Sequence, residues 1–215
     1  MAIYEKTLAT RKPVTEVRCA VLPERMPVIP EEKLNDAQHK VAADIASTPR
    51  GSVRGPFVAM MRSPGLASRM QQLGTFIRFE CELDKRVNVL AGLIVARQWT
   101  NQYIWNGHIA QALEAGISQA VVDAIGEGQR PTEMSELEET TYEFLTELYA
   151  NKGVSDATYK RAEKALGEQG IVELMGVAGY FAINAMIMNV ARTPLRNGGA
   201  PTLAQMPRQL TPIGS

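Results

Sequence analysis

The sequence has few residues that could carry redox or metal chemistry. Among its 215 residues there are two cysteines and two histidines. Cys19 and Cys81 lie far apart and belong to no C-x-x-C motif, so the spacing predicts neither a thiol redox pair nor a zinc cluster. No acidic cluster stands at ligand spacing from either histidine. We therefore expect no metal centre.

No charge of one sign predominates. Lysine plus arginine and aspartate plus glutamate are equal, at 23 each, which gives a formal net charge of zero. A nucleic-acid surface needs an excess of lysine and arginine for phosphate contacts, so we expect no nucleic-acid partner. The first residues, MAIYEKTLATRKPVTEVR, are charged throughout and lack the apolar stretch of a secretory signal. This indicates a cytoplasmic protein.

Long apolar runs are also scarce, and one segment needs comparison with a membrane span. Leu174–Ala191 has eighteen residues without a charge, which is the lower limit of transmembrane length. It contains Gly176, Gly179 and Asn184 and has no polybasic flank. These features favour a buried core or interface helix, and we expect no membrane association.

The remaining pattern is helical. Four prolines in residues 1–30 predict an extended N-terminal arm, and residues 194–215 are a Pro/Gly-rich tail. Between them, residues 31–193 suit a single helical domain. No strand alternation is present, so the fold class is all-α. The expected helices are 31–48, one beginning at Ser63-Pro64, Asp84 to about 100, 101–115, Ser118 to 125, one beginning at the Ser135/Glu138 capping box, Ser155 to 167, and 170–192.

Functional side chains are densest just before His108. Trp99 and Trp105 are the only tryptophans, and Ile104 and Trp105 precede His108 by one helical turn. They can form a partly apolar wall beside an imidazole that titrates near neutral pH, which suits general acid–base catalysis. The alternative is a core histidine satisfied by hydrogen bonds. His39, next to Lys40 on a polar helix face, is expected on the surface.

The segment from Asn88 to Ser118 resembles the core helical hairpin of the carboxymuconolactone decarboxylase and alkylhydroperoxidase D superfamily. The resemblance rests on Val95-Ala96-Arg97, Tyr103-x-Trp105-x-x-His108 and Ala112-Leu113-x-x-Gly116, and extends more weakly over 170–203. It implies an all-helical subunit that assembles as a homotrimer or homohexamer. It also implies decarboxylation of a carboxylated γ-lactone without metal or organic cofactor, with His108 as proton or oxyanion donor.

Several positions depart from the family pattern. Decarboxylase-like members often carry glutamates where this sequence has Val89 and Ile104. Peroxidase-like members carry C-x-x-C where this sequence has Asn101 and Ile104, so dithiol peroxide reduction is excluded at this site. Glu80, Glu82 and Asp84 could replace the missing carboxylates near His108. Alternatively, they cap the helix that begins at Asp84.

The sequence thus predicts a cofactor-free, carboxymuconolactone decarboxylase-like lyase. Its expected ligand is a small carboxylated lactone or a related organic acid from aromatic catabolism. His108 and Tyr103 are the expected catalytic residues, and the expected substrate-binding residues are Arg97, Trp99, Asn101, Gln102 and Trp105. Two alternatives remain: a non-catalytic oligomeric binding or structural protein on the same scaffold, or a peroxidase-related member that has lost its redox cysteines.

Overall fold

A computed structural model describes residues 23–195 and 201–204, and these residues form helices and no strands. The predicted all-α class is therefore confirmed for this part of the chain. Most of the predicted N-terminal arm, much of the C-terminal tail, and Cys19 lie outside the described residues. The elements are η1 (Glu31–Lys33), α1 (Asp36–Ala46), α2 (Pro56–Met60), α3 (Pro64–Thr75), η2 (Phe76–Glu80), α4 (Lys85–Gln98), α5 (Gln102–Glu114), α6 (Gln119–Gly126), α7 (Glu136–Asn151) and α8 (Asp156–Ala191).

Most helices begin where a capping residue predicts. The side chains of Asp84, Ser118 and Ser155 each accept a hydrogen bond from a backbone N–H in the first turn that follows. Ser135 and Glu138 form the predicted capping box at the start of α7. These local hydrogen bonds satisfy backbone donors that have no partner within the helix, which is why the short polar residues fix the helix starts.

Three local features differ from the sequence-based expectation. The first long helix begins at Asp36 rather than residue 31, because Asn35 and Gln38 form a capping box there. Between the predicted helices 31–48 and Ser63-Pro64, where no helix is predicted, Gly55 takes a φ of 58° and is followed directly by α2. A π-helical turn, η2, continues α3. Such a turn has no simple periodic signature in a sequence.

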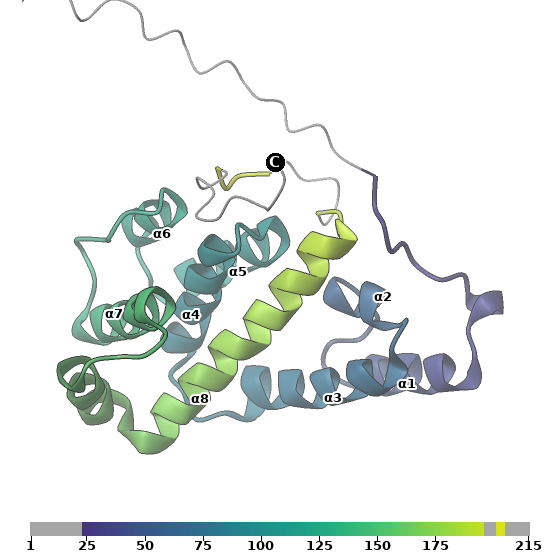
Figure 1. Cartoon of the computed structure of the whole chain (residues 1–215), viewed down its shortest axis with the longest axis horizontal. Helices are drawn as coiled ribbons and strands as arrows, with labels where there is room; N and C mark the ends of the chain where they lie inside the picture. Colours follow the sequence, from purple (N-terminus) through teal and green to yellow (C-terminus); the bar gives the residue numbers. More distant parts are fainter. Residues whose placement is uncertain (1–22, 196–200, 205–215) are drawn as a thin grey trace, which may run out of the picture.

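The last two predicted helices join into α8, which crosses the middle of the molecule in Figure 1. Gly167 interrupts its helical geometry with a φ of 69°, at the predicted break. In the described residues α8 is the one helix long and apolar enough to span a membrane, but 56% of its most apolar window is buried inside the protein. That burial is typical of a core helix.

Helices lie on both sides of α8. In Figure 1, α4 to α7 lie on one side and α1 to α3 on the other. α4 packs against α5, α7 and α8 and is buried along nearly its whole length, from Val87 to Arg97. The core therefore centres on α4 and α8, and α5 lies directly beside both.

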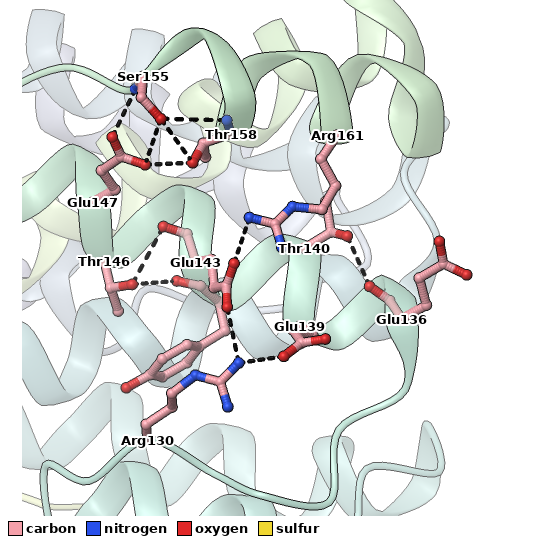
Figure 2. A network of polar contacts seen from close by, with 11 residues as sticks. Arg130, Glu136, Glu139, Thr140, Glu143, Thr146, Glu147, Ser155, Thr158 and Arg161 are labelled. Atoms are coloured by element: carbon pink, nitrogen blue, oxygen red, sulfur yellow. Dashed lines mark hydrogen bonds and ion pairs between the residues drawn. The ribbon is translucent and has the colours of Figure 1, made fainter.

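A polar network fastens the start of α8 to α7 (Figure 2). Arg130 contacts the carboxylates of Glu139 and Glu143, and Arg161 of α8 lies 2.5 Å from the other oxygen of Glu143. One turn further along α7, the Glu147 carboxylate accepts hydrogen bonds from residues of the α8 cap, Ser155 and Thr158. These ion pairs and hydrogen bonds link α7 to the cap and the first two turns of α8.

Candidate functional site

His108 lies on α5 with 6% of its surface exposed. Its Nδ1 is 2.7 Å from the carbonyl oxygen of Ile104, one turn earlier on the same helix. A carbonyl oxygen can only accept, so Nδ1 carries a hydrogen and donates it. In the neutral ring Nε2 is then the basic atom, the one that gains or loses a proton. The helix thereby holds the imidazole in one tautomer.

Two neighbouring helices hold the imidazole from either side. The Phe181 ring of α8 meets it edge to face, with ring centroids 4.8 Å apart and planes at 87°. On the α4 side the ring lies against Gly92, where an added Cβ would be 2.6 Å from Cδ2 and 2.7 Å from Nε2. A side chain of any size at position 92 would overlap the ring, so glycine is required for this close approach.

A cavity of about 440 Å³ opens beside His108. Its walls come from three regions: the segment before and at the start of α2, the η2–α4 region, and the facing surfaces of α5 and α8. Aromatic side chains line part of it, namely Phe79, Tyr103, Tyr180 and Phe181. The size and the mixture of apolar and polar lining suit a small organic ligand.

Among the residues that the structure describes, every charged side chain that lines the cavity is a cation. These are Arg50, Arg54, Arg78 and Lys85. Arg50, Arg54 and Lys85 form no ion pair with any described carboxylate. Four cations and no described carboxylate line the cavity, so its lining favours an anionic ligand.

Arg50 is held in place by aromatic side chains. Its guanidinium donates a 3.2 Å hydrogen bond to the Tyr180 hydroxyl and lies 4.5 Å from the centre of the Phe57 ring. Gly74 permits this arrangement, since an added Cβ there would be 2.3 Å from the Tyr180 hydroxyl. A guanidinium fixed by a cation–π contact and a neutral hydroxyl keeps its full charge for a ligand.

Of the seven predicted site residues, the structure brings two to the cavity. His108 lines it, as does half-buried Tyr103 from the preceding turn of α5. The Tyr103 ring lies against Gly55, where an added Cβ would be 2.9 Å from the hydroxyl oxygen. Gly55 also has a positive φ, so two constraints favour glycine at this position.

The structure places Arg97 and Trp105 outside the cavity. Arg97 donates to the carbonyl oxygens of Gly126 and Ala204, at 2.9 and 2.8 Å, and burial lowers the pKa of its guanidinium. Trp105 is buried against Gly126, where an added Cβ would be 3.0 Å from the indole. Both side chains therefore join α4 and α5 to the end of α6.

Asn101, Gln102 and Trp99 also lie away from the cavity. The Asn101 side chain caps α5 by accepting from Ile104 N–H, and it donates to α8. Gln102 donates to Leu203 and accepts from the backbone of 202 and 203, so it binds the C-terminal segment. Trp99 is 37% exposed at the end of α4. The amide groups of Asn101 and Gln102 thus bind other parts of the protein rather than a ligand.

No carboxylate from the η2–α4 connection enters the site. Asp84 accepts from the backbone N–H of Arg86 at 2.7 Å and caps α4, which confirms the helix-capping alternative for this residue. Glu80 and Glu82 are exposed and do not line the cavity. In the described part of the chain, no group of three His, Cys, Asp or Glu side chains is placed to hold a metal ion. The residue types at the cavity fit an organic anion better than a cation.

Sequence reasoning missed the four cations and Asn184 of α8. Asn184 is 3% exposed and lines the cavity, and its buried Oδ1 accepts no hydrogen bond from a described residue. The only local signal for two of the cations is the repeat Arg50-Gly51 and Arg54-Gly55, where basic residues stand beside turn glycines. Nothing in their spacing relates them to His108, more than fifty residues later.

The sequence matches no family model and no curated protein. The superfamily resemblance therefore stays a prediction from the sequence motifs around His108.

Proposed function

We propose that the protein is a cofactor-free enzyme, a divergent relative of the carboxymuconolactone decarboxylases, that acts on a small carboxylated lactone or related organic acid in the cytoplasm. One observation carries the proposal: the His108 imidazole lines a cavity of about 440 Å³ whose charged lining residues are all cations. A core histidine without a ligand would not need such a cavity. A proton carrier beside a positive, partly aromatic cavity supports acid–base chemistry on an anion.

The chemistry follows from where charge develops. The cations hold the substrate carboxylate. When its bond to the ring carbon breaks, carbon dioxide leaves and the electron pair passes into the lactone carbonyl as an enolate. Arg50, Arg54, Arg78 and Lys85 supply the positive potential that stabilises this oxyanion. A proton delivered to carbon from Nε2 of protonated His108 completes the reaction.

The hydrogen bond to Ile104 supports this role for His108. After Nε2 gives up its proton, the ring is left neutral with its hydrogen on Nδ1, which is the tautomer that donates to the Ile104 carbonyl oxygen. Tyr103, which also lines the cavity, can donate a hydrogen bond to the substrate or to the enolate oxygen. No step requires a redox-active thiol, consistent with Asn101 and Ile104 at the family's cysteine positions.

One observation favours the alternative of a non-catalytic binding protein: no acidic side chain from residues 23–195 or 201–204 lines the cavity. Carboxylated γ-lactones test the choice directly, with binding measured by calorimetry and carbon dioxide release measured in the same samples. Binding with carbon dioxide release supports the enzyme. Binding without release of carbon dioxide supports the binding protein, and failure of every carboxylate to bind would contradict both.

A further inference from the structure

Asn184 lines the cavity with a buried side-chain amide, and the fold leaves one atom of that amide, Oδ1, without a hydrogen-bond donor among the described residues. The residue is 3% exposed, and its Oδ1 accepts no hydrogen bond within the part of the chain that the structure describes. An unsatisfied buried acceptor lowers the stability of the folded state. Such a group therefore calls for an explanation beyond packing.

Another buried asparagine shows how this fold treats a structural amide. Oδ1 of Asn101, 2% exposed, accepts a 2.8 Å hydrogen bond from Ile104 N–H. Its Nδ2 donates to Asn189 Oδ1 at 2.8 Å and to the Ala185 carbonyl oxygen at 3.3 Å. Both ends of that amide are used. Asn184 Oδ1, unlike Asn101 Oδ1, therefore has no structural hydrogen bond among the described residues, which suits an acceptor for a ligand.

Asn184 lies on the face of α8 that lines the cavity beside His108. Tyr180, Phe181, Asn184 and Met188 recur at helical spacing along α8, and all four line the cavity. Asn184 follows by about one turn the phenylalanine whose ring meets the His108 imidazole. Its carboxamide therefore borders the same space in which the proposed chemistry takes place.

We propose that Asn184 Oδ1 accepts a hydrogen bond from a hydroxyl group of the ligand, so that the site selects a hydroxylated carboxylic acid over the analogue without the hydroxyl. The proposal rests on the proposed anion site. An ammonium donor on the ligand would be repelled by the four cations of the cavity, so the proposal assigns a neutral donor, the hydroxyl, to Asn184 Oδ1. A site with a buried acceptor rejects an analogue that leaves the acceptor unpaired.

The stability of the ligand-free protein gives the first test. Replacing Asn184 with leucine removes the unsatisfied oxygen and keeps a similar volume, so the melting temperature of Asn184→Leu should rise by about 2–4 °C. The matched control is Asn101→Leu, which breaks a satisfied set of hydrogen bonds and should lower the melting temperature. A fall for Asn184→Leu would show that its amide is structurally bonded and would overturn the proposal.

Ligand selectivity gives the second test. Benzoate and its 2-, 3- and 4-hydroxy derivatives are titrated into the wild type and Asn184→Leu by calorimetry. At least one hydroxybenzoate should bind the wild type about ten-fold more tightly than benzoate, and Asn184→Leu should lose this preference while its affinity for benzoate changes little. Equal affinity of the wild type for all four acids, or a preference that survives in the variant, would overturn the proposal.

The two tests separate this inference from the proposed function. If no benzoate binds the wild type, the anion site itself is contradicted, whatever the melting temperatures show. If benzoate binds but neither the hydroxyl preference nor the stability gain depends on Asn184, the anion site stands and the role of Asn184 is rejected.

Discussion

The imidazole of His108 occupies the space that a side chain at Gly92 would take, since an added Cβ would lie 2.7 Å from Nε2. Glycine within a helix costs about 1 kcal/mol relative to alanine. At this position in α4 the fold accepts that cost and brings a titratable ring against the helix backbone. The close approach places His108 at the cavity wall.

Gly92→Ala should therefore lower the turnover of the enzyme without unfolding it. The alanine favours the helix by up to about 1 kcal/mol but displaces the imidazole, which the Ile104 carbonyl oxygen and the Phe181 ring hold from other sides. We expect a folded protein with at least a ten-fold loss of turnover and a shifted His108 side-chain nitrogen resonance. The resonance is readily assigned because His39 is the only other histidine.

The exposed Gly65 of α3 provides the matched control for that change. An added Cβ there meets only the end of the Arg69 side chain, at 3.6 Å, which is an ordinary contact. Gly65→Ala should leave turnover and the His108 resonance unchanged. Full activity with an unshifted His108 resonance in Gly92→Ala would contradict the placement of the ring.

The cationic lining predicts weaker anion binding when one charge is removed. Arg54→Met keeps much of the side-chain volume and removes a charge that makes no ion pair with a described residue. A charge-assisted hydrogen bond contributes about 1.5–3 kcal/mol, so the dissociation constant for benzoate should rise about ten-fold or more. Arg69→Met on α3, outside the cavity, should change it less than two-fold. Equal effects of the two substitutions would argue against a specific anion site.

The Glu143 carboxylate predicts a pH-dependent part of stability. Arg130 and then Arg161 hold its pKa below the ordinary value of 4.5 (Figure 2). A lowered folded-state pKa contributes stability above the unfolded-state pKa, and this contribution is lost as the pH falls through the folded-state pKa. Glu143→Gln should be less stable than wild type at pH 7, and the difference in urea midpoint should shrink below about pH 4.

The exposed Glu163 of α8 gives the matched control for that experiment, because it forms no ion pair with a described residue. Glu163→Gln should have little effect on the urea midpoint at pH 7. A difference between wild type and Glu143→Gln that stays constant or widens on acidification would be inconsistent with the ion-pair account.

The outer face of α8 predicts self-association. Five apolar side chains on this helix remain exposed: Val172, Met175, Ile183, Met186 and Val190. A stripe of this kind is typical of an interface, and we propose a homotrimer or homohexamer. Light scattering should give about three or six times 23.6 kDa for the wild type. Ile183→Glu should dissociate the oligomer, while Leu113→Glu on α5 should not. A wild-type monomer would exclude this assembly.

The sequence predicts this fold best where structure is set locally. Asp84, Ser118 and Ser135 cap helices through hydrogen bonds to backbone within three residues, so their effect is visible in the sequence. The start of α2 depends on the positive φ of Gly55 beside Tyr103, which is a tertiary contact. A contact between segments distant in sequence leaves no periodic pattern to detect.

The same distinction applies to the site. His108 and Tyr103 lie five residues apart on one helix, and the motif that contains them identifies both. Arg50, Arg54 and Asn184 reach the cavity only because α2 and α8 pack together. The sequence also predicts ligand contacts that the structure does not show. Arg97 and Gln102 are polar and are expected to bind substrate, but they donate to the backbone carbonyl oxygens of Gly126 and Leu203. Polarity alone does not distinguish a ligand contact from a backbone contact.

The most direct measurement is the turnover of His108→Asn on a carboxylated γ-lactone from which the wild type releases carbon dioxide, with binding and melting temperature measured in parallel. Asparagine retains hydrogen bonding but cannot exchange a proton near neutral pH, so turnover should fall by about two to four orders of magnitude. Binding and fold should be retained, and the surface variant His39→Asn should be as active as the wild type. Normal turnover by a folded His108→Asn, or its unfolding, would contradict His108 as the acid–base residue.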